Sequence, residues 1–410
     1  MVTSPGLDRT EVLREVGAAE RHLARICFKT GPPTYTGTEL EWTVHDAVDP
    51  ARPVSRDRLR TALGRYAPQT LGVDRDADLL PRGGAVTVEP GGQIEISTRP
   101  QRSLAALADA TDADLATLTE LLATAGLALG GSGIDPHRPP RPVVDTPRYR
   151  AMRCVFDRRG PAGRTMMYST AGLQVCLDAG EPGQVAARWV AAHALGPPLI
   201  AAFATAGRHN GRHTGWASAR MAAWLHIDPA RTSPVWSPTA TGDPVDAWIR
   251  YALDAPLLCL RADRTDWTPP AGVTFADWIG GALPRPPTTD DLDYHLSTLF
   301  PPVRPRGYLE IRYLDAQPGR GWLTPVAVLT ALLADPATVA EVSATCLPVA
   351  DRWDSAARHG LTDPALSRAA ATVLGLALRD LDRTGLPADR RTEISDDLRR
   401  RIAAAERGHR

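Results

Sequence analysis

Pairs of charged or amide side chains two residues apart recur along this chain, and their spacing suits them for chemistry. The first pair, Glu39 and Glu41, lies in the stretch 37–44, whose Thr, Trp and Val residues favour a β-strand. In a strand, both carboxylates point to one face, about 6.5–7 Å apart, while Leu40 points the other way. Because two carboxylates on one face repel each other, this spacing indicates a cation between them or a shared proton.

The same spacing returns on two more predicted strands. One carries Gln93 and Glu95, with Glu89 just before its turn, and the other carries Glu310 and Arg312. Oxygen ligands gathered from several strands are what Mg²⁺ requires, together with phosphate oxygens and water. A solvated polar face on an edge strand would explain one such pair. Three pairs, each with apolar alternate residues, favour a magnesium–nucleotide site on a sheet.

Arginines near glycines form the second group of candidates. A guanidinium binds the oxygens of a carboxylate or phosphate as a fork, although an arginine-rich chain also places solvated arginines in its loops. His295 has two readings as well, as a ligand or base, or as a hydrogen-bonded structural histidine. The sequence has no GxxxxGK[ST], GxGxxG, HExxH or GxSxG motif, which argues against Walker or Rossmann nucleotide binding and against a covalent-nucleophile hydrolase. The arginine candidates are Arg164, Arg220, Arg231, Arg304 and Arg306.

Composition limits the class of protein. The chain has 410 residues, 43% of them hydrophobic and 23% charged, which is typical of a globular protein. Its formal net charge of +0 argues against a general nucleic-acid binder. The five cysteines form no CxxC pair, so a disulfide scaffold or zinc ribbon is not expected. With neither a signal peptide nor an apolar run long enough for a membrane span, we expect a cytoplasmic protein with no membrane partner.

The hydrophobic pattern predicts strands interleaved with long helices, an α+β layout. We expect one domain over residues 1–410, with a mainly helical C-terminal part, 323–410, packed on it. The predicted helices cover 9–26, 55–66, 102–128, 184–206 and a region around 216–226, and 134–150 is predicted to be a loop. The predicted strands are 37–44, a hairpin over 85–97 with a turn at Pro90–Gly92, a strand over 163–178, and 308–313.

A series of motifs in this chain resembles the plant and proteobacterial type of glutamate–cysteine ligase. The resemblance covers about residues 40 to 315, ends after about 322, and is greatest to the actinobacterial branch that serves ergothioneine biosynthesis. One departure lies at 205–211, where the plant type tends to carry Ser-Pro-Phe and this chain has Ala206–Asn210. The motifs, in the family's order, are GTELEW at 37–42, EPGGQIEIS at 89–97, MMYSTAGLQVCLD at 166–178, GRHTGWASAR at 211–220, DPARTSP at 228–234, DAWIRYALDAPLL at 246–258 and HLSTLFPPVRPRGYLEIRYLD at 295–315.

The resemblance implies a glutamine synthetase-like antiparallel sheet, formed into a funnel and flanked by helices, which binds ATP and Mg²⁺. It implies metal-binding roles for Glu39, Glu41, Glu95 and Glu310, with Gln174 at a further metal-facing position. It implies substrate or nucleotide contacts for Glu89, Gln93, Arg164, Arg231 and Arg304. Arg220 and Arg312 are the expected catalytic residues. The resemblance implies that Arg220 and Arg231 hold a substrate carboxylate or the transferred phosphate, and that Arg312 contacts the phosphates.

The implied reaction joins the γ-carboxylate of L-glutamate to the amine of L-cysteine through a γ-glutamyl phosphate, at the expense of ATP. Three alternatives stay open from the sequence. The same scaffold could ligate another amine, it could bind ligands without catalysis, or it could act as a metal-dependent hydrolase. A requirement for ATP separates the ligases from the hydrolase.

Overall fold

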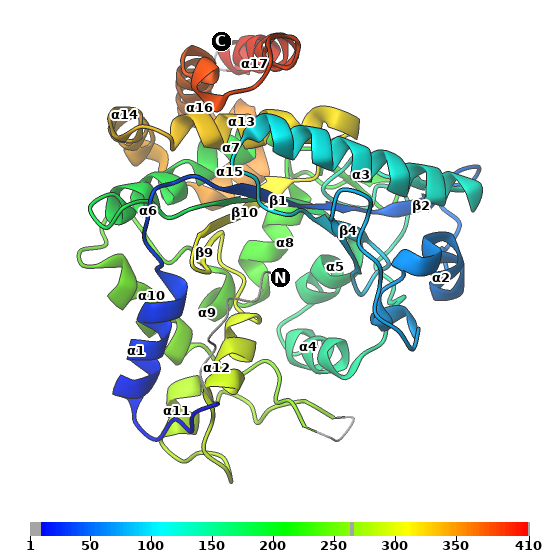
Figure 1. Ribbon diagram of the computed structural model, residues 1–410, viewed down its shortest axis with the longest axis vertical. Helices are drawn as coiled ribbons and strands as arrows, with labels where there is room; N and C mark the ends of the chain where they lie inside the picture. The colour runs from blue at the N-terminus through cyan, green and yellow to red at the C-terminus, as the bar shows by residue number, and fades with distance from the viewer. Residues whose placement is uncertain (1–9, 263–265, 409–410) are drawn as a thin grey trace.

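The computed structural model describes residues 10–262 and 266–408, and its centre is one six-stranded sheet (Figure 1). All neighbouring strands pair antiparallel, in the order β3-β4-β1-β6-β10-β9. This arrangement, with helices on both sides, confirms the expected α+β class and antiparallel sheet. The strands are β1 (Thr36–Trp42), β3 (Ala85–Val88), β4 (Ile94–Ser97), β6 (Gly172–Leu177), β9 (Val303–Pro305) and β10 (Leu309–Asp315).

The two faces of the sheet differ in chemistry, as the period-2 pattern predicts. Leu40, Ile96, Val175 and Ile311 are all buried on the apolar face. Residues of the opposite parity on the same strands are polar and point to the other face. They include Glu39, Glu41, Glu95, Gln174, Glu310 and Arg312.

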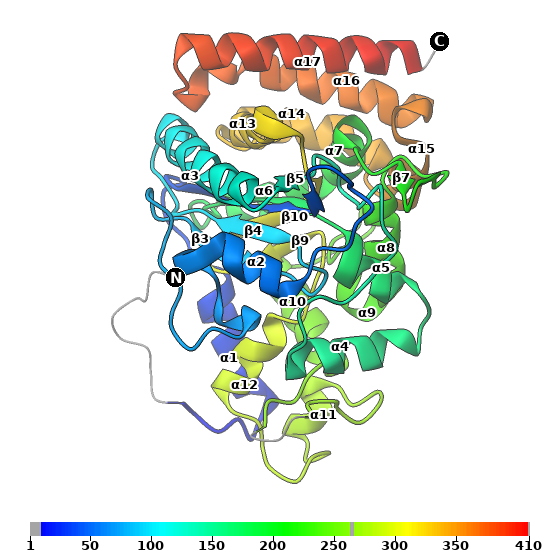
Figure 2. The same cartoon turned by 90° about the vertical axis from the view of Figure 1, so that its right-hand side faces the viewer.

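A layer of helices covers the apolar face, above the sheet in Figures 1 and 2. One cluster of buried apolar side chains runs from Leu40 to Leu398 and so joins the C-terminal helices to the sheet. This layer contains α3 (Leu104–Thr124), α6 (Val185–Ala194), α7 (Gly196–Phe203), α13 (Leu323–Leu332), α14 (Pro336–Cys346), α15 (Trp353–His359), α16 (Pro364–Arg379) and α17 (Ala388–Gly408).

The helices on the polar side pack mainly on one another. Trp248, Phe275 and Leu292 belong to one apolar cluster, and Met152 and Phe156 belong to a second. Because these helices bury their apolar faces against each other, the polar face of the sheet borders a cavity instead of a core. The helices are α1 (Val16–Cys27), α4 (Pro147–Asp157), α5 (Ala162–Ser169), α8 (Ala219–Ile227), α9 (Pro229–Thr232), α10 (Pro244–Asp254), α11 (Phe275–Ile279) and α12 (Thr289–Leu296).

Smaller elements complete the described chain. β2 (Val44–Asp46) pairs with β5 (Leu127–Leu129), and β7 (Arg208–His209) pairs with β8 (Arg212–His213). α2 (Arg56–Leu63) leads into a short 3-10 turn at Gly64–Tyr66. Further 3-10 turns lie at Gln69–Leu71, Gly319–Trp322, Leu347–Val349, Gly360–Thr362 and Leu381–Thr384.

Several predicted elements differ from the observed ones. The strand expected over 163–178 begins only at Gly172, because the preceding residues form α5, whose Pro161 and Gly163 start a helix that buries Met166 and Met167. The helix expected over 184–206 is broken into α6 and α7 at Gly196, which is followed by two prolines that cannot continue the ladder of α6.

Other helix boundaries were also wrong. The helix predicted over 9–26 begins at Val16. The predicted loop 134–150 ends early, because Thr146 caps α4 and Pro147 occupies its first position. The helix near 216–226 begins at Ala219, after its cap residue Ser218.

No single helix in the described ranges is long and apolar enough to cross a membrane. One pair of segments, Gly319–Leu332 and Pro336–Val349, meets that test jointly by length and composition, but the two are bent by 107°. Val326, Val328 and Leu329 of the first segment are fully buried in the protein core.

Candidate active site

A cavity of about 210 Å³ lies against the polar face of the sheet. Its walls differ in charge: β1 and β4 supply carboxylates, β9 and β10 supply Arg304 and Arg312, and the helices supply Arg148 and apolar groups. The lining residues are Glu39, Glu41, Glu89, Pro90, Gln93, Glu95, Arg148, Tyr149, Met152, Met166, Met167, Thr170, Gln174, Trp224, Ser297, Phe300, Arg304 and Arg312.

The pairing of the strands brings the acidic residues together. Glu41 is the direct partner of Glu95 across β1 and β4, and Glu39 is the partner of Gln174 across β1 and β6. Side chains of such partners stand next to each other on one face. Positions far apart in the sequence therefore form one wall, which contains four of the predicted site residues.

Burial, with charge repulsion added to it, disfavours ionisation of the carboxyls in this acidic wall. Burial, and then the charge of Glu41, raise the pKa of Glu89 to about 7. Burial and the charges of Glu39 and Glu41 raise the pKa of Glu95 well above its usual range. Burial and the neighbouring Glu310 also raise the pKa of Glu39. Each raised pKa means that the folded protein disfavours the ionised form of that carboxyl. A cation bound at this wall would stabilise the ionised form.

The chemistry of these donors fits Mg²⁺, which takes oxygen ligands and keeps several waters. The carboxylates supply hard oxygens, and the buried Oε1 of Gln93, which lines the same cavity, has no hydrogen-bond partner. Within the described residues, no three Asp, Glu, His or Cys side chains are already arranged to hold a metal ion. The wall therefore offers suitable ligands without a preassembled protein cage.

The turn between β3 and β4 fixes two of the lining residues. The Glu89 backbone N–H donates to the Gln93 carbonyl oxygen at 2.8 Å, and the Gln93 Nε2 donates to the Thr170 carbonyl oxygen at 2.8 Å. Gly91 lies so close to Tyr168 that a Cβ there would be 2.2 Å from the Tyr168 carbonyl oxygen. Only glycine fits at this position, which explains the Pro-Gly-Gly sequence of the turn.

Glu310 differs from the other carboxylates because arginines surround it. Nε of Arg304 donates to its Oε2, and Nη2 donates to its Oε1 at 3.0 Å. Arg312 Nη1 lies 3.3 Å from the Oε2 of Glu310, and Arg306 Nη1 lies 3.5 Å from its Oε1. Burial opposes ionisation of Glu310, but Arg304 and Arg312 outweigh it and hold its pKa at about 2. The predicted metal-binding role of Glu310 stays a prediction, since its oxygens are bound by guanidinium groups.

Gln174 connects the basic and acidic sides of the cavity. Arg312 Nη1 donates to the Oε1 of Gln174, and the Nε2 of Gln174 donates to Glu41 Oε1 at 3.3 Å. The other oxygen of Glu41 accepts a hydrogen bond of 2.7 Å from the Gly172 backbone N–H. The predicted catalytic residue Arg312 therefore lies at the cavity and is in contact with the predicted metal-facing side chain.

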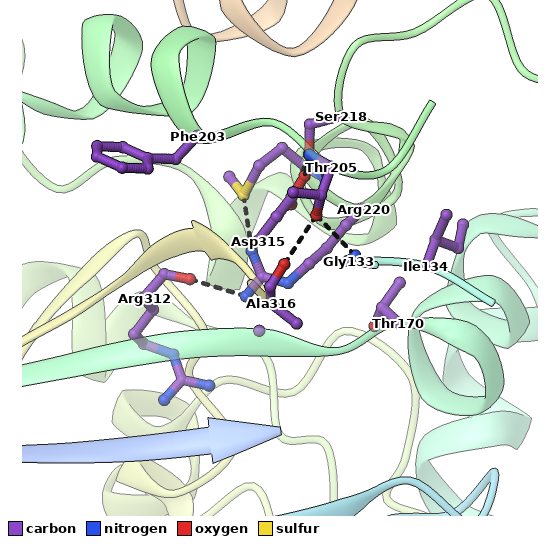
Figure 3. Close-up of polar contacts among 12 residues, drawn as sticks. Gly133, Ile134, Thr170, Phe203, Thr205, Ser218, Arg220, Arg312, Asp315 and Ala316 are labelled. Atoms are coloured by element: carbon purple, nitrogen blue, oxygen red, sulfur yellow. Dashed lines mark hydrogen bonds and ion pairs between the residues drawn. The ribbon is translucent and has the colours of Figure 1, made fainter. Parts of the chain in front are cut away.

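Arg220, the other predicted catalytic residue, lies behind the cavity wall and is 3% exposed (Figure 3). Its Nη2 donates to the Arg312 carbonyl oxygen at 2.8 Å, and its Nη1 is 3.9 Å from Asp315 Oδ1. Ser218 Oγ donates to the same Asp315 oxygen at 2.8 Å. A Cβ on Gly172 would lie 2.3 Å from Arg220 Nη2, so the guanidinium packs directly on β6. This geometry supports a positioning role for Arg220.

Three other candidates also lie away from the cavity. Arg164 is exposed and forms two hydrogen bonds with Asp157, of 2.7 and 2.8 Å. Arg231 is fully buried, and it donates to Asp228 at 2.8 Å and to the carbonyl oxygens of Pro256 and Thr298. His295 Nε2 donates to the Ala252 carbonyl oxygen at 2.9 Å, the geometry of a structural histidine. The geometry gives no support to ligand binding by these three side chains.

Sequence reasoning missed Arg148, Tyr149, Trp224 and Phe300, all of which line the cavity. For Arg148 and Tyr149 a signal existed. Thr146 followed by Pro147 is a helix start, and it predicts that the next residues occupy the first turn of a helix. For Trp224 and Phe300, the neighbouring sequence does not distinguish a residue that lines a cavity from a residue buried in the core.

Known proteins resemble this chain over almost its whole length. The model of the family "Glutamate-cysteine ligase family 2 (GCS2)" matches residues 35–408, and so extends past residue 322, where the motif resemblance ends. Glutamate–cysteine ligase EgtA of Mycolicibacterium smegmatis is 41% identical over 368 residues, which cover 88% of this chain and 83% of the relative. The EgtA protein of Mycobacterium tuberculosis is 39% identical over 409 residues, 98% of this chain and 89% of the relative.

Among solved structures, one match is the glutamate–cysteine ligase of Francisella tularensis in complex with AMP. The match covers 93% of this chain and 95% of the solved chain. That match has a TM-score of 0.41 and 12% sequence identity. The family assignment rests instead on the sequence matches, which include a model that spans most of the chain and relatives with about two-fifths of their residues identical. This chain belongs to glutamate–cysteine ligase family 2.

Proposed function

We propose that this protein ligates the γ-carboxylate of L-glutamate to the amine of L-cysteine, with ATP as the source of the phosphoryl group. The observation that carries the proposal is the cavity, in which a wall of carboxylates faces arginines on one polar sheet face. The family membership and the names of the relatives support the same reaction. We also propose that the chain is one catalytic domain, acts in the cytoplasm and supplies ergothioneine biosynthesis.

A carboxylate is a poor electrophile, so the reaction needs its oxygen converted into a leaving group. Transfer of the γ-phosphoryl group of ATP to glutamate gives an acyl phosphate, and the cysteine amine then displaces phosphate. Two anions must meet in the first step. Arg304 and Arg312, on the basic side of the cavity, are suited to stabilise the charge that develops there.

Mg²⁺ is the cofactor that we propose for the acidic wall, with Glu39, Glu41 and Glu95 as the residues that would hold it. When bound, Mg²⁺ neutralises phosphate charge and orients the nucleotide. Glu41 is kept in place by the Gly172 N–H and by Gln174, whatever occupies the cavity. Cysteine enters as a substrate, so the protein's own thiols are not needed.

The experiment is a measurement of ADP release with Mg²⁺-ATP and glutamate across a panel of amines. We expect release that depends on glutamate and is greatest with cysteine. Release that needs glutamate but favours another amine would support a different ligase on the same site. Release without glutamate would contradict the ligase and favour a hydrolase, and no release with any amine would favour a binding protein.

A single substitution tests the acidic wall in the same assay. Glu41→Gln keeps one acceptor oxygen, replaces the other by an NH2 donor and removes a negative charge, so turnover should fall strongly while the fold is kept. Activity within a few-fold of the unmodified enzyme at limiting Mg²⁺ would contradict the role of Glu41 in metal binding.

A further inference from the structure

Arg148 differs from the other arginines of the cavity in its partners. Arg304 and Arg312 both form ion pairs with Glu310. In the described ranges, no carboxylate lies within ion-pair distance of the Arg148 guanidinium, although Arg148 lines the same cavity. Its positive charge acts on Glu89 of the same cavity and lowers the pKa of that carboxyl, but the two side chains form no ion pair.

Neutral groups fix the position of this guanidinium. Nη1 donates to Ser297 Oγ at 3.0 Å, and Nη2 donates to the Ser297 carbonyl oxygen at 2.9 Å. The guanidinium carbon lies 5.1 Å from the centre of the Tyr294 ring, and the guanidinium of Arg261 lies 4.6 Å from the same ring centre. Since a guanidinium has five N–H donors, two hydrogen bonds to Ser297 leave capacity for a ligand. The group is held in one orientation before any ligand arrives.

The backbone around Arg148 adds positive potential. Arg148 and Tyr149 lie in the first turn of α4, an 11-residue helix whose cap residue Thr146 accepts from the Tyr149 N–H at 3.2 Å. The first N–H groups of a helix carry partial positive charge, and these two residues line the cavity. The helix start and the guanidinium both favour an anion here.

A second donor in the same cavity lacks an acceptor. The indole nitrogen of Trp224 is buried and has no hydrogen-bond partner, and Trp224 lines the cavity. An indole N–H can only donate, and leaving it buried without a partner is unfavourable. Its ring is anchored by the Arg312 guanidinium, 5.6 Å from the ring centre. The Trp224 N–H therefore requires an acceptor that the protein does not supply, and the Arg148 guanidinium keeps N–H donors beyond those bound by Ser297.

We propose that Arg148 is a further substrate-binding residue, whose guanidinium binds an anionic oxygen pair of a substrate, with the Trp224 indole N–H as a second donor in the cavity. The oxygen pair is either the α-carboxylate of an amino-acid substrate or a phosphate of the nucleotide, since a guanidinium fork fits both. This inference rests on the proposed ligase function. It adds a binding residue from α4, outside the strand motifs.

Steady-state kinetics of Arg148→Lys and Trp224→Phe test this assignment. Lysine keeps the charge but loses the planar fork, and phenylalanine keeps the ring but loses the N–H. We expect Arg148→Lys to raise the KM for one substrate by about tenfold or more, with a smaller change in kcat, and Trp224→Phe to raise a KM as well. A higher KM for ATP identifies a phosphate, and a higher KM for glutamate or cysteine identifies a carboxylate.

The matched control is Arg158→Gln at the C-terminal cap of the same helix, where the side chain is exposed, and it should leave every constant unchanged. Melting temperatures of all variants show whether they fold. Arg148→Ala should regain part of its activity when guanidinium ion is added, which a purely structural role would not allow.

The assignment is overturned if Arg148→Lys and Trp224→Phe keep all three KM values within about twofold of those of the unmodified enzyme. A fall in kcat alone, without guanidinium rescue of Arg148→Ala, would also overturn it. The unmodified enzyme separates this failure from that of the proposed function. If it shows no glutamate-dependent ADP release, the ligase function fails and the inference with it, whereas normal ligation with unchanged KM values removes only the role of Arg148.

Discussion

Glu310 and Arg304 are direct partners across the antiparallel strands β10 and β9, and their side chains meet as a two-point ion pair. Both side chains are buried, with exposed fractions of 0% and 7%. A buried carboxylate is stable only with such partners, because its charge has left water. The pair therefore fixes the edge of the sheet nearest the basic side of the cavity.

Arg304→Gln should destabilise the fold by about 3 kcal/mol, since it removes the main partner of a buried charge. Urea unfolding near neutral pH measures this change. Glu310→Gln combined with Arg304→Gln should recover part of the loss, because the double variant no longer holds a buried carboxylate at position 310 without its main partner. A double variant less stable than Arg304→Gln alone would show that the ion pair is not the cause.

Glu95→Gln should stabilise the protein when no metal is present. The raised pKa of Glu95, caused first by burial and then by Glu39, means that its neutral form favours the folded state. That contribution is complete below the carboxyl's ordinary pKa and is lost as the pH rises through the raised value. At neutral pH in EDTA, the melting temperature of the variant should therefore exceed that of the unmodified protein.

The same variant should lose the stabilisation that Mg²⁺ gives to the unmodified protein, and turnover with it. Thr87 Oγ1 and Ser97 Oγ donate to Glu95 Oε1, at 3.1 and 2.9 Å, and glutamine keeps an oxygen for both. An unchanged gain in melting temperature with Mg²⁺ would exclude Glu95 as a ligand.

Gly91→Ala should destabilise the β3–β4 turn by about 1–3 kcal/mol, because the new Cβ would overlap the Tyr168 backbone. Movement of the turn would also displace Glu89 and Gln93, so turnover should fall. Gly183→Ala is the matched control, since nothing lies within 4 Å of a Cβ there. Equal melting temperatures for the two variants would contradict the close approach.

His193 should make the fold sensitive to mild acid. Burial lowers its pKa to about 4, and its Nδ1 is 2.9 Å from the Trp189 carbonyl oxygen. An unfolded histidine binds a proton near pH 6.5, so the stability from the neutral imidazole is complete above that pH and is lost as the pH falls towards 4.

Between about pH 7.5 and about pH 5, this group should reduce the free energy of unfolding by about 2 kcal/mol. His193→Asn cannot titrate and should show a smaller decrease in urea unfolding over the same range. An identical decrease in both proteins would show that His193 is not a source of the acid sensitivity.

The sequence predicts the carboxylate wall well because strand alternation is a local property. Glu39 and Glu41 share a face wherever β1 lies in the sheet. Gln93 lies in the turn just before β4, but it lines the same cavity as Glu95. The pairing of Glu41 with Glu95 is not local, since it depends on the register of two strands more than fifty positions apart in the chain. The recurrence of the pattern on three predicted strands indicates one shared site, but it does not predict which residues pair across the strands.

The arginines show the limit of sequence reasoning. Arg164, Arg231 and Arg304 have the same side chain and lie near similar loops, but their partners differ. One pairs with an exposed Asp157, one donates to buried backbone carbonyls, and one reaches the cavity. The nearest carboxylate or carbonyl in space decides between these outcomes, and residue type and spacing do not record it.

The alternation along β1 also limits the length of this strand. β4 and β6 pair with β1 through hydrogen bonds on both of its edges. Because β1 is not an edge strand, a bulge cannot easily accommodate an added or deleted residue. One extra residue before Glu39 would turn its carboxylate into the apolar layer and Leu40 into the cavity. Insertions that preserve ligation are therefore confined to the connections between strands. The length of β1 sets the positions of the cavity residues on its two neighbouring strands.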